Sequence, residues 1–169
     1  SDSTSEGSQR PGHFSGVATV VSKLFNIVQP DHAYFGQKDG MQCVVIRRLT
    51  KDLDFPVDIR VCPTIRAGDG LALSSRNVYL TPAERAVAPV LFKSLTAANE
   101  AYQRGERNST VLKQLARKVL EAEPMGKFEY VSLADADSGE EIPDGANIQS
   151  AVFNSTGDLQ QGGAMLSIA

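Results

Sequence analysis

Two short clusters of side chains in this sequence have the types and order needed to hold a charged ligand. The first is Gly36-Gln37-Lys38-Asp39, directly after the apolar run Ala33-Tyr34-Phe35. The second is Leu73-Ser74-Ser75-Arg76, at the end of a loop that contains Gly68 and Gly70. A strand that opens into a Gly-Lys-Asp turn stands where open parallel sheets bind their ligands, and glycines let the backbone approach closely. Together the two clusters predict a site for a nucleoside triphosphate.

The two clusters would contribute different chemistry. Lys38 supplies a mobile charge for a phosphate and Asp39 an acceptor for ribose hydroxyls, while Ser74, Ser75 and Arg76 can hold several phosphate oxygens at once. Transfer at an α-phosphate needs cations on both sides of the phosphorus, because charge develops on the equatorial oxygens and the departing pyrophosphate. Taken alone, the first cluster fits a solvated surface turn better, and the second fits a capping turn equally well. Neither has the P-loop pattern.

Composition sets the class of protein. The chain has 169 residues, 41% of them hydrophobic and 22% charged, which is ordinary for a soluble globular protein. A net charge of −3 argues against a nucleic-acid partner, although residues 36–76 carry a local +2 from seven Lys/Arg and five Asp. No apolar run has membrane length, and residues 1–9 are polar and small, typical of a disordered lead-in. We therefore expect a cytoplasmic protein that is not bound to a membrane.

The cysteines and histidines have no spacing typical of a metal site. Cys43 and Cys62 are expected to be buried, reduced thiols. His32 is expected on the surface ahead of a strand. His13 follows Arg10-Pro11-Gly12 at a helix start, so His13 and Arg10 are candidates for the rim of a cleft.

The first part of the chain predicts a βαβ unit. Apolar residues at helical spacing predict a helix from His13 that ends at Pro30. A short buried strand over 33–35, a helix over 41–49 and a strand over 57–62 follow within about thirty residues, with a right-handed crossover. Two strands make too small a sheet for a doubly wound domain. The sheet is therefore expected to be completed by a missing segment or by a partner.

After Arg76 the sequence pattern changes to one that predicts helices followed by short strands. Thr81-Pro82-Ala83-Glu84 is a helix start, followed by one long helix with Val87 to Tyr102 on its apolar face and Gly105 as its C-terminal cap. A further helix is predicted over 109–123. Strands over 128–134, 150–154 and 164–168 would then form an antiparallel sheet. The predicted domains are 10–65, part of a nucleotide-binding domain, and 66–169, a small α+β domain.

These residues closely resemble the pantothenate synthetase (pantoate–β-alanine ligase) family. The matching text is R-P-G-H-F-S-G-V-A-T-V-V at 10–21, Q-P-D-H-A-Y-F-G-Q-K-D at 29–39 and P-T-I-R-A-G-D-G-L-A-L-S-S-R-N-V-Y-L at 63–80. The resemblance is dense to about residue 80 and thinner beyond it. It implies an α/β fold with a partial Rossmann-like nucleotidylyl-transferase sheet, followed by a C-terminal lid domain.

The resemblance also implies an activity. In this family the carboxylate of pantoate attacks the α-phosphate of ATP, giving pantoyl adenylate and pyrophosphate, and the amine of β-alanine then displaces AMP to give pantothenate, a precursor of coenzyme A. Mg²⁺ is bound through the ATP phosphates, and the full-length enzyme is a homodimer. By the matching motifs, Lys38 and Arg76 would be catalytic and Gln42 would bind pantoate. The ATP-binding residues would be Gly36, Gln37, Lys38, Asp39, Ile65, Leu73, Ser74, Ser75 and Arg76.

The sequence departs from the family pattern at four places. Gln37 replaces the usual Glu, and Gly68 adds flexibility to the hinge within R-A-G-D-G. The usual C-terminal ending is absent from 150–169. The N-terminal H-x-G-H motif, whose histidines hold ATP phosphates, is also absent from these 169 residues. We therefore expect a C-terminal part of a longer synthetase, with weak ATP binding and little activity alone.

Three other interpretations remain open at this level. The chain could be a non-catalytic nucleotide-binding fragment that keeps the loops without the chemistry. It could be part of a tRNA ligase of the same superfamily, which the net charge of −3 disfavours. It could be a purely structural oligomerisation domain, but that interpretation does not explain the two donor-rich loops.

Overall fold

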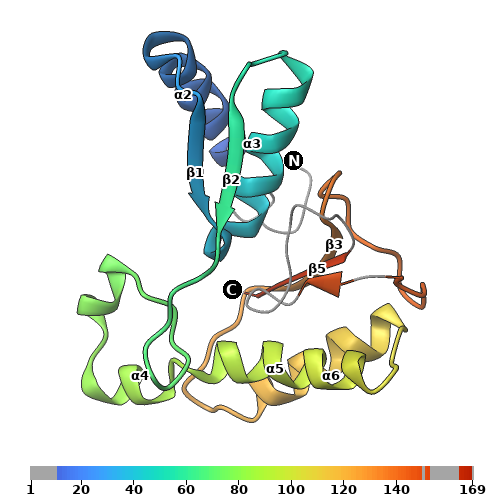
Figure 1. The fold of residues 1–169 in the computed structure, drawn as a ribbon. Coiled ribbons are helices and arrows are strands. Elements are labelled where there is room, and N and C mark those ends of the chain that lie inside the picture. Colours follow the sequence, from blue (N-terminus) through green and yellow to red (C-terminus); the bar gives the residue numbers. More distant parts are fainter. Residues whose placement is uncertain (1–10, 150, 153–163, 169) are drawn as a thin grey trace.

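The computed structural model describes residues 11–149, 151–152 and 164–168 of the chain. Two parts of different build follow one another along the sequence (Figure 1). The first contains α2 (His13–Val28), β1 (His32–Gly36), the short 3₁₀ helix η1 (Gln37–Asp39), α3 (Gly40–Asp52) and β2 (Asp58–Cys62). The second contains η2 (Ser75–Tyr79), α4 (Pro82–Val87), α5 (Val90–Gln103), α6 (Ser109–Glu121), β3 (Val131–Asp135), β4 (Ala151–Val152) and β5 (Ala164–Ile168).

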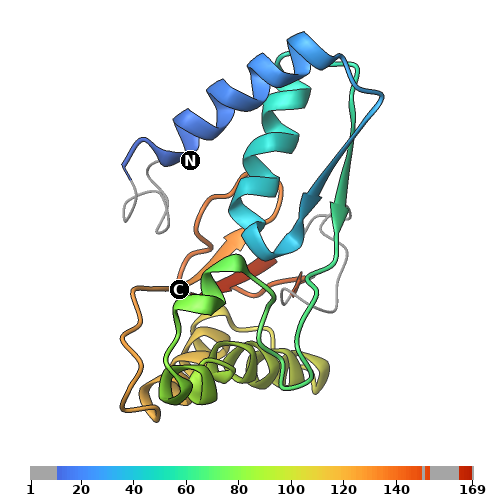
Figure 2. The ribbon, with the colours of Figure 1, turned by 90° about the vertical axis from the view of Figure 1, so that its left-hand side faces the viewer.

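The βαβ unit predicted from the sequence is present. β1 and β2 pair in parallel, from His32 opposite Asp58 to Gly36 opposite Cys62. Figure 2 shows α2 and α3 on the same side of these strands. The core on that side joins the two helices to alternate strand residues, and it includes Val21, Phe25, Ile46, Ala33, Phe35 and Ile59.

The opposite face of β1 and β2 is open, which corrects the expectation of a buried strand at 33–35. Along both strands the residues alternate between half-buried and exposed, and the side chain of Tyr34 is 65% exposed. His32 lies on this open face, within β1, where its Nδ1 is 3.1 Å from Asp58 Oδ2. One face of this small sheet is therefore apolar and covered, and the other is polar.

Helix α2 has the predicted bounds, but only part of its apolar surface is covered. Phe14, Val21 and Phe25 are buried. The helix ends as expected just before Pro30, where Gln29 takes a left-handed conformation. Residues on another side of the helix are more than half exposed, namely Val20, Leu24, Ile27 and Val28.

The long helix expected after Thr81 is two helices. Thr81 and Glu84 form the predicted capping box at the start of α4. The helix ends at Val87, and Pro89 then occupies the N-cap position of α5 without a side-chain capping bond. Proline lacks the N–H that an unbroken helix would need at this point, and its ring clashes with the preceding turn. Gly105 follows α5 with a φ of 105°, as a C-terminal glycine does.

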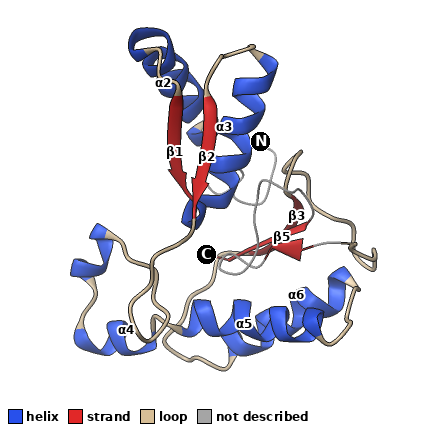
Figure 3. Cartoon of the chain, in the orientation of Figure 1, coloured by secondary structure: helices blue, strands red, loops and turns tan. Residues whose placement is uncertain are grey.

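The C-terminal sheet is mixed, whereas the sequence predicted an antiparallel one. Its strand order is β3-β5-β4, with β5 antiparallel to β3 and parallel to β4. Of the strand expected over 150–154, only residues 151 and 152 lie within the described part of the chain. Helices α5 and α6 pack together beneath β3 in one core that includes Leu95, Ala98, Leu112, Ala116 and Leu133. Figure 3 shows the connection from β2 to these helices as loop, apart from short helical turns.

The two parts share a core, so the boundary predicted near residue 65 is not the only place where they meet. Phe14, Met41 and Val44 of the first part pack with Ala134 and Ala136 of the second. Cys43 is buried in this cluster as expected, but Cys62 is exposed at the end of β2, which corrects the expectation of two buried thiols.

Candidate functional site

The first cluster, and the loop that leads to the second cluster, start at the same edge of the parallel sheet. Gly36 and Cys62 are register partners at the carboxyl ends of β1 and β2. The Gly36–Asp39 cluster therefore leaves the sheet beside the loop that starts at Pro63 and leads to Leu73–Arg76. This is the edge at which open α/β sheets bind ligands.

The first cluster is a turn of 3₁₀ helix that leads directly into α3. Lys38 and Asp39 are both exposed, and Lys38 Nζ lies 3.7 Å from Asp39 Oδ1. Gln37 as a whole residue is only 5% exposed, so little of either its side chain or its backbone is open to a ligand. Gln42 lies half-buried in the first turn of α3. The N-terminal N–H groups of α3 add a partial positive charge at this end.

The buried Cys43 is hydrogen-bonded to the backbone of the first cluster. Its thiol donates to the carbonyl oxygen of Gly36, with Sγ 3.3 Å from that oxygen. Burial, and secondly the nearby charge of Asp39, raise the pKa of this thiol to about 11. The cysteine is therefore a neutral packing residue rather than a nucleophile.

The second loop begins as a closed hairpin over residues 65–73. The N–H of Leu73 donates to the Ile65 carbonyl and the N–H of Ala67 to the Leu71 carbonyl, each at 2.8 Å. A further bond of 2.9 Å, from the Gly70 N–H to the Ala67 carbonyl, forms the turn. Ile65 and Leu73, both predicted to contact ATP, are thus paired across the hairpin base and are 66% and 57% exposed.

Side chains from the C-terminal helices hold this hairpin. The guanidinium of Arg66 lies 4.2 Å from the centre of the Phe92 ring and donates to the Gly70 carbonyl at 3.1 Å. At the tip, Asp69 Oδ2 accepts from Arg85 Nη1 at 2.5 Å. This bond, and then the bond from the Leu71 N–H, hold the pKa of Asp69 below its usual value, while burial lowers the pKa of Arg66.

The residues of the second cluster follow the hairpin directly. Ser74 caps the 3₁₀ helix η2, and its Oγ accepts from the Arg76 N–H at 3.2 Å. Asn77 Nδ2 donates to the Ala72 carbonyl at 3.0 Å and ties η2 back to the hairpin. Ser75 and Arg76 are exposed. The cluster therefore presents a hydroxyl and a guanidinium to solvent from a turn whose backbone is fixed.

Of the two residues predicted at the rim of a cleft, His13 and Arg10, the structure describes only His13. His13 lies in the first turn of α2, half-buried, with its ring centre 5.2 Å from that of Phe14. Arg10, its predicted companion, lies outside the described residues. Sequence reasoning missed the roles of Phe92 and Arg85, because their partners Arg66 and Asp69 are 26 and 16 residues away, and no local pattern links them.

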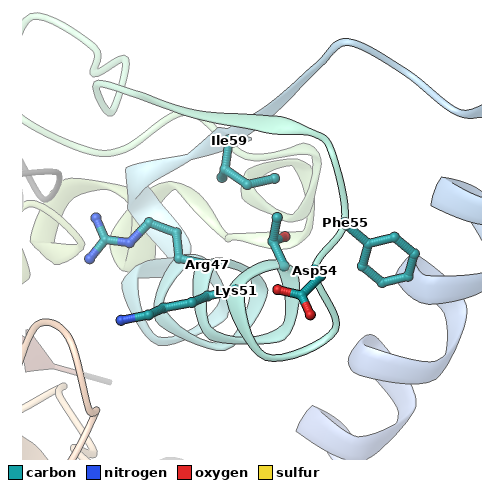
Figure 4. Close-up of a pocket in the computed structure, with 6 residues that line it drawn as sticks. Arg47, Lys51, Asp54, Phe55 and Ile59 are labelled. Carbon is teal, nitrogen blue, oxygen red and sulfur yellow. The ribbon is translucent and has the colours of Figure 1, made fainter.

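Two hollows of the described part of the chain lie along the C-terminal half of α3. One, of about 490 Å³, is lined by Arg47, Thr50, Lys51, Asp54, Phe55 and Ile59 (Figure 4). A neighbouring hollow of about 440 Å³ shares Arg47, Lys51 and Ile59 and adds Arg48 and Asp137. Neither contains a residue of the two clusters. In Figure 4 the Arg47 and Lys51 side chains extend to the same side of α3.

The described residues include neither a membrane-spanning helix nor a cluster of metal-binding side chains. None of their helices is both long and apolar enough to cross a membrane. Within the same part of the chain, no group of three or more His, Cys, Asp and Glu side chains is arranged to hold a metal ion.

Comparison with known proteins identifies the family. The family described as pantoate-beta-alanine ligase matches residues 1–160. Pantothenate synthetase of Chloroflexus aggregans is 56% identical over 155 residues, covering 89% of this chain and 56% of that protein. The corresponding protein of Roseiflexus castenholzii is 58% identical over 137 residues, covering 81% of this chain and 49% of that protein.

The fold agrees with this result. A crystal structure of pantothenate synthetase from Thermus thermophilus superposes with a TM-score of 0.77 at 45% identity, covering 82% of this chain and 50% of that one. The chain thus spans about half the length of the relatives that it matches. It belongs to the pantoate-beta-alanine ligase family.

Proposed function

We propose that this chain forms part of an ATP-dependent ligase that condenses pantoate and β-alanine to pantothenate, releasing AMP and pyrophosphate. The observation that carries the proposal is the parallel pairing of β1 with β2, which starts both donor-rich loops at one sheet edge. Its relatives, named pantothenate synthetase, support the choice of substrates.

The proposed reaction has two steps. A carboxylate oxygen of pantoate attacks the α-phosphorus of Mg·ATP, the bond to pyrophosphate breaks, and pantoyl adenylate forms. The amine of β-alanine then attacks the carbonyl carbon, AMP leaves with the C–O bond electrons, and the amine loses a proton to solvent. Lys38 and Arg76 would stabilise the charge on the transferring phosphate, because both are exposed cations on these loops.

The remaining residues would bind and orient substrates. The exposed side chain of Ile65 would lie against adenine, and Leu73 would line the same site. Ser74 and Ser75 would bind phosphate oxygens, as would the backbone of the exposed Gly36, and the largely buried Gln37 would complete the turn that holds ATP. Asp39 would accept from ribose hydroxyls, and Gln42, in the first turn of α3, would donate to pantoate. Magnesium would enter as part of Mg·ATP, held by phosphate oxygens.

We also propose that the 169 residues alone bind ATP weakly and turn over little. They contain no H-x-G-H sequence, so the phosphate contacts expected of that motif would be absent. Ligase turnover by this chain at a rate of about 1 s⁻¹ or more, typical of an enzyme, would contradict this part of the proposal. For the whole enzyme we propose a cytoplasmic location and a homodimeric assembly. Analytical ultracentrifugation of the full-length protein would test the assembly.

Titration calorimetry with Mg·ATP tests the site directly. We expect weak binding by this chain that is lost in the Lys38→Ala, Arg76→Ala double variant. The matched control is Arg48→Ala, Lys51→Ala, which removes the same charge from exposed positions at the far end of α3. Equal binding by all three proteins, or equal loss in both variants, would overturn the assignment of Lys38 and Arg76.

A further inference from the structure

The loop that carries Ser74, Ser75 and Arg76 is fastened to the C-terminal helices rather than to the parallel sheet. Its preceding hairpin is closed by the two 2.8 Å bonds, Leu73 to Ile65 and Ala67 to Leu71. A displacement of the hairpin tip is therefore passed to its base, where Ser74 begins. The position of the tip consequently helps to set the position of the phosphate-binding loop.

The tip is tied to α4 by an ion pair. Asp69 Oδ2 lies 2.5 Å from Arg85 Nη1, while the other carboxylate oxygen of Asp69 accepts from the Leu71 N–H at 3.2 Å. Arg85 belongs to the same short helix that starts at the Thr81 cap. The segment from Leu73 to Thr81 is thus held at both ends, at one end by the hairpin and at the other by α4. The Asp69–Arg85 ion pair joins the hairpin to α4 directly, so the two supports of this segment are linked to each other.

A second contact places the hairpin against α5. A side chain at Gly70 would overlap the ring of Phe92, so the backbone of the hairpin lies directly on that residue. Arg66 covers the same ring with its guanidinium. Between the end of β2 at Cys62 and the first hairpin bond at Ile65 stand only Pro63 and Thr64. The hairpin therefore begins within three residues of the sheet.

We propose that Asp69 and Arg85 are positioning residues that hold the Ser74–Arg76 loop on the C-terminal helices. The pair then holds the hairpin tip beside Gly68, where the sequence suggested added flexibility. This proposal rests on the proposed function in taking Ser74–Arg76 as the phosphate-binding loop. The competing interpretation is a surface ion pair of no consequence, since the two side chains are 44% and 37% exposed.

Amide hydrogen exchange on the 169-residue chain decides between them. In Arg85→Gln we expect exchange at the Ala67 and Leu73 amides to rise up to about five-fold, the range of an exposed ion pair, with α5 and α6 amides and the melting temperature unchanged. Arg85→Lys should restore protection. The control Arg48→Gln removes an equally simple exposed pair, with Asp52, and should leave the hairpin unchanged. Unaltered protection in Arg85→Gln, or equal loss in the control, would overturn the proposal.

Mg·ATP calorimetry on the same variants separates this proposal from the proposed function. Weaker binding in Arg85→Gln, restored in Arg85→Lys, supports a positioning role. Unchanged binding despite a deprotected hairpin refutes that role. If the unsubstituted chain binds no ATP, its proposed ATP binding fails, and the exchange result still decides whether the pair holds the loop.

Discussion

Gly70 is a residue of the candidate site at which the backbone leaves no room for a side chain. Its φ is +96°, and an added Cβ would overlap the Phe92 ring. We expect Gly70→Ala to lower the free energy of unfolding by about 1–3 kcal/mol, because it combines an unfavourable φ with a steric overlap. Urea unfolding measures this change.

Gly68 provides the matched control two residues away. Its φ is not in the left-handed range, and nothing lies within 4 Å of an added Cβ. Gly68→Ala should therefore leave stability unchanged or raise it by about 0.5 kcal/mol, through the lower entropy of the unfolded chain. Equal destabilisation by both substitutions would contradict the packing of the hairpin on Phe92.

The buried Cys43 thiol should make the free energy of unfolding decrease as the pH rises into the alkaline range. Burial raises its pKa from 9.0 to about 11 in the folded chain. Below pH 9 the thiol is protonated in both states, so its contribution to stability is fully present. Between pH 9 and 11 only the unfolded state loses the proton, and the free energy of unfolding falls by an amount on the order of 2 kcal/mol.

Urea unfolding at pH 8 and pH 10.5 measures this fall in the unsubstituted chain and two variants. Cys43→Ala should show a smaller decrease with pH, because the titrating group is gone. Cys62→Ala is the matched control at an exposed cysteine and should keep the decrease that Cys43 causes. If Cys43→Ala and the unsubstituted chain lose the same stability over this range, the thiol does not contribute as argued.

At the scale of the elements, α6 depends on a capping side chain for its start. Asn108 Oδ1 accepts from the N–H groups of Thr110 and Val111, at 3.0 and 3.3 Å. The helix packs its buried Leu112 and Ala116 into the C-terminal core. Asn108→Ala should cost about 1 kcal/mol of global stability, as measured by thermal or urea unfolding, because loss of the cap weakens a helix that the core requires.

Asn108→Asp is the conservative control, because it keeps the acceptor and adds a negative charge that favours a helix N-terminus. It should remain near the stability of the unsubstituted chain. A loss as large as that of Asn108→Ala would show that the amide group, and not the cap, is what matters. The Asn108 amide also donates to the Gly145 carbonyl at 3.5 Å, a long contact that should contribute little.

Local signals predicted most of the elements, and long-range contacts account for what was missed. The Thr81 cap, the Gly105 ending and the βαβ order all follow from residues close in sequence, and the structure confirms them. The break at Pro89 also had a local signal, but the apolar spacing from Val87 to Tyr102 suggested a continuous helix. Periodicity gives an apolar face without saying which part of it is covered, so the exposure of Val20 and Leu24 could not be predicted.

In the candidate site, too, local sequence signals predicted some features, and tertiary contacts determine the others. Motif resemblance selected the two clusters, and the parallel register places the first cluster beside the start of the loop that leads to the second. The contacts that hold the second loop, Asp69 with Arg85 and Arg66 with Phe92, join residues from separate elements. The burial of Gln37 likewise depends on packing around the turn rather than on its own residue type. Such facts come from tertiary structure, which spacing along the chain does not specify.

On the scale of the whole molecule, Arg47 joins the two parts. From α3 its Nη2 donates to the Ala136 carbonyl at 3.0 Å and lies 3.4 Å from Asp137 Oδ1, and its side chain is only 19% exposed. Beside it, Ala134 and Ala136 pack on Met41 and Val44. Helix α3 and the end of β3 are thus linked by a packed contact, in addition to the loop after β2 that joins the two parts along the chain.

Substitution of Arg47 should weaken this link. We expect Arg47→Gln to lower the free energy of unfolding by about 1–3 kcal/mol, because the partly buried Ala136 carbonyl loses a charged donor. Hydrogen exchange should then report separate opening of the two parts, with α3 amides losing more protection than those of α5 and α6. Arg48→Gln, next in sequence but exposed and paired with Asp52, should change stability by no more than about 0.5 kcal/mol. If Arg47→Gln leaves the two sets of amides equally protected, the shared apolar cluster alone couples the parts. Any domain motion during the reaction would then be limited by packing, and not by this arginine.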